Sequence, residues 1–213
     1  MVITLQEREF VLLPQKAVYK PDEALLIIAD VHLGKARHFL KGGINIPSSA
    51  QQQDYQNLAQ LFITYQPRKV YFLGDLFHSS INTEWMRFES LVQAFSDIEF
   101  TLIKGNHDII DARLYARLDI RVATDYLEDD HFIYSHYPFE TAVDKTVFSG
   151  HIHPSFRLYG KARQSVLLPC YHCSAYNFML PSFGGLTGSF AIKPLAGDRV
   201  FVVYADIVKE IVP

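Results

Sequence analysis

The stretch Thr101-Leu102-Ile103-Lys104-Gly105-Asn106-His107-Asp108 carries the end of an apolar run directly into four polar residues. The apolar run predicts a strand, and the glycine lets the chain turn sharply where that strand ends. Asparagine offers a neutral carbonyl oxygen, and histidine offers an acid, a base or a ligand nitrogen. Open α/β sheets place their chemistry at such strand ends. Taken alone, the tetrapeptide is more often a polar turn, so its interpretation depends on the rest of the chain.

Two earlier apolar runs end in similar residues. Residues 24–29 are all apolar, which suits a strand covered on both faces. Asp30 and His32 follow this run. Residues two apart in an extended segment point the same way, so this carboxylate and this imidazole form a good pair of metal ligands. Residues 69–73 predict a second strand, which ends at Gly74 and Asp75. A carboxylate at that position can bridge two metal ions, because each of its oxygens can serve one ion.

Two later runs end in histidine. Residues 131–135 alternate into His136, and residues 146–149 lead into Gly150-His151-Ile152-His153-Pro154. Five strand-like runs therefore end in imidazole, carboxylate or amide groups, without a thiolate. Such a donor set suits Mn, Fe or Zn better than Cu(I) or an iron–sulfur cluster.

The remaining pattern predicts one domain that spans residues 1–213. A hairpin is expected around Pro14, and helices are expected up to Tyr65, from about Asn82 to Phe95 and from Ile109 to Leu118. From Ile120 onward, short strands separated by turns replace the helical pattern. The chain has no internal repeat, low-complexity tract or linker, and its 213 residues suit one sizeable core.

Charge and hydropathy indicate which binding partners and which cellular compartment to expect. The formal net charge of −3 and the pI near 6.3 give no global attraction to nucleic acid, so such binding needs a local basic patch. No apolar run approaches the roughly 18 residues that span a membrane, and the start does not resemble a signal peptide, so we expect a cytoplasmic protein without a membrane partner. Cys170 and Cys173 form a lone Cys-x-x-Cys without a second pair, which predicts ordinary packed thiols.

Together, the motifs closely resemble those of the calcineurin-like metallophosphoesterase superfamily. The resemblance spans about Leu26 to Pro154 and implies an α/β (α+β) fold, a four-layer αββα sandwich of two mixed sheets flanked by helices. It also implies two divalent metal ions, with manganese as the first expectation and Fe or Zn as alternatives. The ligands implied for one ion are Asp30, His32, Asp75 and His153. The ligands implied for the other ion are Asp75, Asn106, His136 and His151.

The resemblance also implies roles for two histidines that are not ligands. His107 matches the histidine that protonates the departing alkoxide or stabilises the charged phosphoryl group. His78 stands where nucleases of this superfamily that repair double-strand breaks also carry Gly-Asp-Leu-Phe-His, so we expect it to orient His107 or a nearby phosphate. Phosphoprotein phosphatases have an aspartate there and Arg-Gly after it, and the absence of both argues against a protein phosphatase.

A closer resemblance is to the ligase-associated DNA-damage-response endonuclease family. Residues 30–36, 74–79 and 150–154 carry it, and Leu-Pro-Ser-Phe-Gly-Gly-Leu-Thr-Gly at 180–188 is similar to that family's Leu-Pro-Ala-Phe-Gly-x-Phe-Thr-Gly. Ser182 and Leu186 depart from the pattern. Members are bacterial and are associated with an ATP-dependent DNA ligase, a helicase and an exonuclease-like protein, which implies a DNA endonuclease linked to repair.

Two other functions remain open on the sequence. The same metal core would serve a phosphodiesterase or phosphatase that acts on a small nucleotide or another phosphoester. A non-catalytic scaffold of the same fold would instead predict missing ligands or a replaced His107, and neither is present. DNA binding would require cations near the site, and Lys35 and Arg37 are the first candidates for phosphate contacts. Further candidates are Lys41, Arg157, Lys161 and Arg163.

Overall fold

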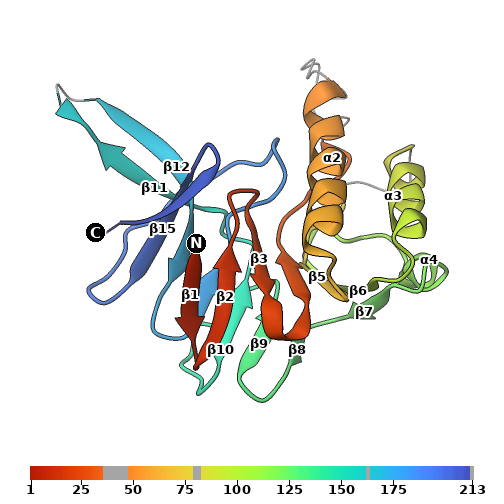
Figure 1. The fold of residues 1–213 in the computed structure, drawn as a ribbon, viewed down its shortest axis with the longest axis horizontal. Helices are drawn as coiled ribbons and strands as arrows, with labels where there is room; N and C mark the ends of the chain where they lie inside the picture. The colour runs from red at the N-terminus through yellow and green to blue at the C-terminus, as the bar shows by residue number, and fades with distance from the viewer. Residues whose placement is uncertain (36–47, 79–82, 162–163, 212–213) are drawn as a thin grey trace.

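The computed structural model describes residues 1–35, 48–78, 83–161 and 164–211, and it arranges their strands in two sheets (Figure 1). The first sheet has seven strands in the order β1-β2-β3-β4-β5-β6-β7. Their bounds are β1 Val2–Leu5, β2 Arg8–Leu12, β3 Ala17–Lys20, β4 Leu25–Ile28, β5 Lys69–Leu73, β6 Glu99–Ile103 and β7 Arg121–Ala123. Strands β1 to β4 are antiparallel neighbours, whereas β4 to β7 are parallel.

Helices make the crossovers between the parallel strands of the first sheet. Helix α2 (Ser48–Tyr65) lies between β4 and β5, α3 (Thr83–Ala94) between β5 and β6, and α4 (Ala112–Ala116) between β6 and β7. A short 3-10 helix, η1, covers Pro21–Glu23. Asp111 caps α4 by accepting a hydrogen bond from the backbone N–H of Arg113. The helix expected at 109–118 is therefore shorter than predicted, while the other two helices match their predicted positions closely.

The second sheet contains the short strands that follow Ile120. Its main path runs β14-β11-β12-β13-β10-β9-β8, and β15 pairs with β12 and β16. The strands are β8 Tyr126–Glu128, β9 Phe132–Ser135, β10 Thr146–Ser149, β11 Pro154–Tyr159, β12 Ser165–Cys173, β13 Asn177–Met179, β14 Phe190–Ala191, β15 Arg199–Tyr204 and β16 Ile207–Ile211. Strand β10 is parallel to both β9 and β13, whereas β12 is antiparallel to its neighbours, so this sheet is also mixed.

Strand β4 shows how the layers are held together. All four of its residues are buried, and their side chains alternate between two cores. Leu26 and Ile28 pack in the core that the helices share with the first sheet. Leu25 and Ile27 pack in the core between the two sheets. The helices thus gather on one side of the first sheet and the second sheet covers its other side (Figure 1), which confirms the predicted sandwich of two mixed sheets.

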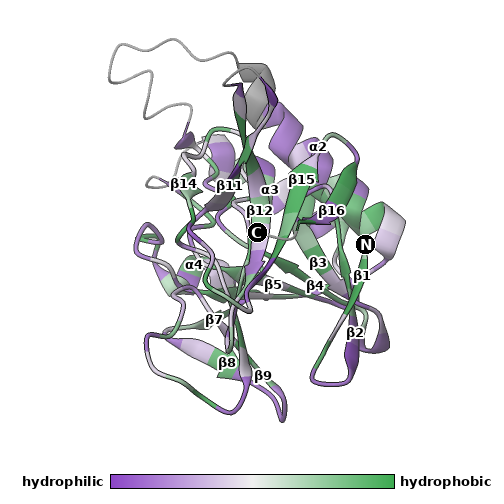
Figure 2. Ribbon diagram, turned by 90° about the vertical axis from the view of Figure 1, so that its left-hand side faces the viewer, coloured by the Kyte–Doolittle hydropathy of each residue, from purple (hydrophilic) through white to green (hydrophobic). Residues whose placement is uncertain are grey.

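Figure 2 colours each residue by its hydropathy: hydrophobic residues concentrate in the strands, while α2 is largely hydrophilic.

A smaller buried cluster of Cys170, Val200 and Val202 lies on β12 and β15. Both cysteines are free, with Cys170 buried and Cys173 half-buried, which confirms packed thiols. Strand β1 was not predicted, and β7, β8 and β16 were expected only as short strands after Ile120, without bounds. Within the described ranges, no helix is long and apolar enough to cross a membrane.

Candidate metal centre

The predicted ligands meet where the loops after β4, β5 and β6 face the loops after β9 and β10. At five of these positions the backbone adopts a positive φ, although none is a glycine. The angles are 54° at Asp30, 52° at His32, 51° at Asp75, 67° at His151 and 52° at His153. Such conformations cost about 1–3 kcal/mol each and persist only where the surrounding structure enforces them, typically at functional sites.

Backbone hydrogen bonds extend the first sheet into the ligand loops and enforce this conformation. The N–H of His32 donates to the carbonyl of Asp75 over 2.8 Å, and the N–H of Asp30 donates to that of Gly74 over 3.2 Å. Gly74 has a φ of 77°, and a Cβ there would collide with the imidazole of His136. A glycine is therefore required where the first sheet and His136 approach each other.

Asp108 joins the loops after β5 and β6, and sequence reasoning assigned it no role. Its side chain is 2% exposed and accepts hydrogen bonds from the N–H groups of four residues. These donors are Asp75 at 2.7 Å, Leu76 at 3.0 Å, Phe77 at 3.2 Å and Gly105 at 2.9 Å. Burial raises the pKa of Asp108 to about 6, and the N–H donors oppose that shift. The carboxylate thereby holds two ligand-bearing loops in one arrangement, and its position three residues after Gly105 was the only sequence signal.

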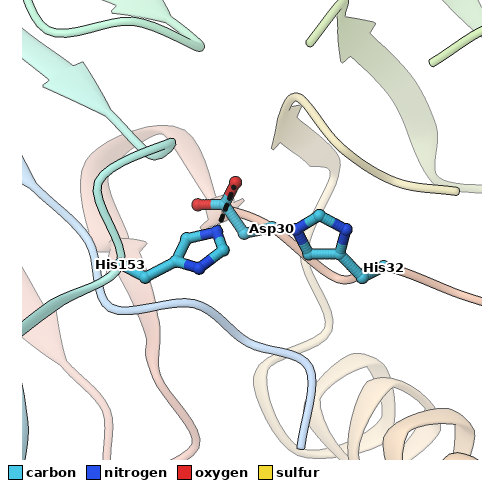
Figure 3. Close-up of side chains that lie close together, drawn as sticks. All are labelled: Asp30, His32 and His153. Carbon is cyan, nitrogen blue, oxygen red and sulfur yellow. Dashed lines mark ion pairs between the residues drawn. The ribbon is translucent and has the colours of Figure 1, made fainter. Parts of the chain in front are cut away.

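The first group of donor atoms comes from Asp30, His32 and His153, drawn in Figure 3. The Nε2 of His153 lies 3.2 Å from Oδ1 of Asp30. The other ring nitrogen, Nδ1, lies 3.1 Å from the carbonyl oxygen of Gly188, which can only accept a hydrogen bond. Nδ1 therefore donates to Gly188, and Nε2 is the ring nitrogen that faces Asp30.

The second group contains Asp30, Asp75 and His136. The Nδ1 of His136 donates to the carbonyl of Leu73 over 3.0 Å, so its Nε2 is the ring nitrogen that faces the other donors. That nitrogen lies 3.2 Å from Oδ1 of Asn106 and 3.6 Å from Oδ1 of Asp75. The resemblance assigned Asp30 and His136 to different ions, and Oδ1 of Asp30 lies 3.9 Å from Nδ1 of His136.

Asp75 lies between the two sets of ligands that the resemblance implied. Its Oδ2 lies 3.7 Å from Nε2 of His32, and its Oδ1 lies 3.6 Å from Nε2 of His136. The backbone N–H of His107 donates to Oδ1 over 2.9 Å. Each carboxylate oxygen thus faces a histidine of a different set, as a bridging ligand requires.

His151 completes the cluster from the second sheet. Its Nδ1 lies 3.2 Å from Nε2 of His136, and its backbone N–H donates to Oδ2 of Asp30 over 2.9 Å. Burial lowers its pKa, and the neighbouring His136 lowers it further. Both effects favour the neutral imidazole, which is the form that binds metal.

The chemistry of the donor atoms fits divalent cations. Among the described residues, Oδ1 of Asp30 and Nε2 of His32 are buried and have no hydrogen-bond partner. Burial, the largest cause, lowers the pKa of His32 to about 2, and the nearby Lys35 contributes next, so this imidazole is neutral. Buried lone pairs on oxygen and nitrogen that face one another without a proton between them are costly unless a cation binds them. The carboxylate and imidazole groups present are ligands of Mn, Fe and Zn.

His78 and His107 lie beside the metal-binding groups. The Nδ1 of His78 lies 3.3 Å from Nδ1 of His32, and the rings of His78 and His107 have centroids 4.6 Å apart. The ring of His107 is 5.5 Å from that of His32. The three imidazoles therefore form one cluster, although sequence alone left the partner of His78 open between His107 and a phosphate.

The predicted cationic contacts are only partly described. Lys35 lies near the acids of the site, because Asp75 and Asp30 raise its pKa while burial, the larger effect, lowers it. Arg157 instead bonds Ser165 across the hairpin of β11 and β12, which extends away from the body of the protein in Figure 1. Lys161 is exposed beside this hairpin. Arg37, Lys41 and Arg163 lie outside the described residues.

The chain is similar to solved structures and matches a protein-family model. The chain is similar to a nuclease, MPE, from Pseudomonas putida, with 26% sequence identity, a TM-score of 0.83 and coverage of 99% of each chain. A phosphoesterase from E. coli, YfcE, has a TM-score of 0.49 at 10% identity over 88% of this chain and 97% of its own. No curated protein matches the chain. The family model for calcineurin-like phosphoesterase matches residues 24–206. The chain therefore belongs to the calcineurin-like phosphoesterase family and is a hydrolase that acts on phosphoester bonds.

Proposed function

We propose that this protein is a dinuclear metal-dependent phosphodiesterase that cleaves DNA as an endonuclease linked to repair. The observation that carries the substrate assignment is its likeness to a nuclease over 99% of both chains. The clustering of the donor groups, with Asp75 between them, supports two ions. We also propose that residues 1–213 form a single domain of this family.

In this proposal each ion takes four protein ligands. Asp30, His32, Asp75 and His153 hold one ion. Asp75, Asn106, His136 and His151 hold the other. When bound, two such ions lower the pKa of a water molecule and offset negative charge on the phosphoryl group. Manganese is the proposed metal, with Fe or Zn as alternatives, because the donor set accepts all three.

The protein's own groups orient the ester and move the proton. His107 donates a proton to the departing oxygen or stabilises the phosphoryl charge, and its backbone N–H fixes Oδ1 of Asp75. His78 lies beside both His32 and His107 and orients one or both rings. Lys35 and Arg37 contact substrate phosphate, which compensates locally for the net charge of −3.

The repair role extends the resemblance of the 30–36, 74–79, 150–154 and 180–188 motifs to ligase-associated endonucleases. An enzyme of that kind would work in the cytoplasm beside a DNA ligase, a helicase and an exonuclease-like protein. We further propose that single-stranded or flapped DNA enters the open site more easily than duplex DNA. Equal rates on intact blunt duplex and on a matching single strand would contradict this preference.

The first experiment strips the protein of metal and reconstitutes it with manganese, iron or zinc. Hydrolysis is then compared on single-stranded DNA, a cyclic nucleotide and bis-p-nitrophenyl phosphate, with Asp75→Asn as the inactive control. DNA cleavage that disappears in the control supports the proposal. Hydrolysis of the small diesters alone would favour the alternative function, a phosphodiesterase of small nucleotides, and would remove the DNA assignment.

A further inference from the structure

A cavity of about 220 Å³ lies against the metal centre and is not used by the proposed mechanism. His153 lines it on the side of the metal ligands, and Lys16 and Ser155 line it from other strands and turns. Much of the remaining wall is the segment 182–189, which contains most of the Leu-Pro-Ser-Phe-Gly-Gly-Leu-Thr-Gly motif. The motif therefore forms a surface beside the reaction centre.

The same backbone builds the cavity wall and supports the ligands. The N–H of Phe183 donates to the carbonyl of Ala29 over 2.9 Å, and the N–H of Gly184 donates to that of Asp30 over 3.1 Å. Gly184 approaches so closely that a Cβ would collide with the carbonyl of Val31. Figure 3 shows the segment, in light blue, passing close to His153, whose Nδ1 donates to Gly188. A ligand in the cavity would thus lie next to the metal-binding groups.

Several polar groups of the wall already have partners. The hydroxyl of Thr187 donates to the carbonyl of Gly184 over 2.7 Å, and the hydroxyl of Ser182 contacts that of Thr187. Asp54 accepts a hydrogen bond from the N–H of Gly185 over 3.0 Å. These groups shape the wall and are not free to recognise a ligand.

Two lining groups remain available for a ligand. Ser155 is 1% exposed, and its Oγ has no hydrogen-bond partner in the described part of the chain. The ammonium of Lys16 forms no ion pair or side-chain hydrogen bond with the residues that the structure describes. No carboxylate is among the residues that line the cavity, although Asp54, which accepts from the N–H of Gly185, lies near enough to affect Lys16. The cavity thus presents an ammonium and a hydroxyl, which together favour an anion.

The charge of Lys16 persists at neutral pH. Burial lowers its pKa to about 8, and the nearby Asp54 opposes that shift. A half-buried ammonium without an ion pair gains when an anion binds beside it. Phosphates recur at every nucleotide of a DNA strand, so a strand with one phosphate at the metal centre has another close by.

We propose that this cavity binds the phosphate next to the one being cleaved, with Lys16 as its principal contact. The inference rests on the proposed function and adds a substrate-positioning site to it. It gives the 180–188 motif a role, because that segment forms the wall between the neighbouring phosphate and the ligands Asp30 and His153.

Chromogenic esters test this site when they carry a second phosphate at a defined position relative to the ester that is cleaved. One pair is the p-nitrophenyl ester of thymidine 5′-phosphate, with and without an added 3′-phosphate. The other pair carries the ester on the 3′-phosphate, with and without a 5′-phosphate, and covers the opposite strand direction. In the wild type, the added phosphate should raise kcat/KM by about 10-fold in one pair, as one charge-assisted contact would.

Variants of Lys16 separate its charge from its packing. Lys16 has a φ of 62°, and Met and Arg keep a side chain of similar length on the same backbone. Lys16→Met should lose the gain from the added phosphate, whereas Lys16→Arg should keep it. Lys209→Met, on the exposed part of β16, is the matched control and should also keep it. The ratio within each pair does not respond to a general loss of folded protein.

Either of two results would overturn the inference: no gain in either pair, or the same gain in Lys16→Met as in the wild type. The DNA assignment is judged separately, from cleavage of single-stranded DNA by the wild type. If the wild type hydrolyses the esters but leaves DNA intact, the proposed substrate is wrong, while the ratios still decide whether the cavity binds a phosphate.

Discussion

The two sheets contribute different halves of the proposed metal centre. The first sheet supplies all the oxygen donors, from Asp30, Asp75 and Asn106, together with one imidazole. The second sheet supplies imidazoles alone, from His136, His151 and His153. Neither sheet by itself brings together a complete set of donors, so the site exists only where the sheets pack against each other.

The donors also differ in burial, but this difference does not follow the sheets. Asp30 and Asp75 of the first sheet and His136 of the second are buried, whereas Asn106 and His151 are exposed and His153 is half-buried. The carboxylates also bind backbone N–H groups from other loops, so their positions depend on the surrounding fold. We therefore expect the two kinds of donor to differ in how activity responds to their loss. Excess metal should not restore activity after loss of a buried carboxylate, but it should restore activity after loss of an exposed imidazole.

The largest effect is expected from Asp75→Asn. The change weakens a group placed to serve both ions, and each ion contributes several kcal/mol of transition-state stabilisation, so turnover should be abolished. The measurement is kcat/KM on bis-p-nitrophenyl phosphate, together with the bound metal content. Asp22→Asn, an exposed aspartate in η1, should retain wild-type values. Substantial activity in Asp75→Asn, at any metal concentration, would refute the bridging role.

His107→Ala should separate proton transfer from metal binding. Because His107 is not among the proposed ligands, metal content should stay at the wild-type level, while turnover falls by about 10²–10⁴-fold. Metal analysis and kcat are measured on the same preparation. His131→Ala removes an exposed histidine and serves as the control. A purified His107→Ala protein with full activity would exclude the assigned role.

His151→Ala tests how the site responds to the loss of an exposed imidazole. We expect the half-saturating metal concentration to rise at least about 10-fold, with activity largely restored by excess metal. The measurement is a metal titration of activity beside that of Asp75→Asn. If excess metal rescues neither variant, the contrast between the buried oxygen donors and the exposed imidazole does not hold.

The smallest effect concerns Asp54, which joins α2 to the segment beside the cavity. Burial raises its pKa to about 6, so the folded protein holds this proton more strongly than the unfolded chain does. The contribution of Asp54 to the free energy of unfolding should therefore fall as pH rises from about 4 to 6 and stay constant above. After allowance for solvent screening, this contribution to the free energy of unfolding should change by on the order of 1–2 kcal/mol across that pH range.

Chemical denaturation at several pH values between 4 and 7 measures this contribution as the difference between wild type and Asp54→Asn. The variant keeps an oxygen that can accept from the N–H of Gly185. Asp97→Asn, an exposed aspartate, is the control. A wild-type-minus-variant difference that does not change with pH would contradict the expected titration.

Much of the first sheet could be predicted because the sequence signals for its strands lie within short stretches of the chain. The apolar run of β4 and the glycine before Asp75 indicate buried strands with turns at their ends, and parallel strands bring those ends to one edge. Short strands such as β7 and β8 could not be located because each has only three residues, too few to show a hydrophobic period. Their strand conformation depends on neighbours that are distant in the sequence.

The supporting contacts of the site were hidden for the same reason. Asp108 receives three of its four hydrogen bonds from residues about 30 positions away. Lys16 and His153 line one cavity although 137 positions separate their numbers, and no pattern around Lys16 indicates a binding role. Gly188 stood within a recognised motif, yet its contact with His153 becomes visible only in the folded chain.

The sequence by itself determined which donor atoms this protein carries and that each follows a strand, because residue type and hydrophobic periodicity are local properties. Only the tertiary structure decided which donors face one another, which of them are buried and which cavity adjoins them. Those features depend on how two sheets pack across a shared core, and that packing is set by contacts between residues far apart in the chain.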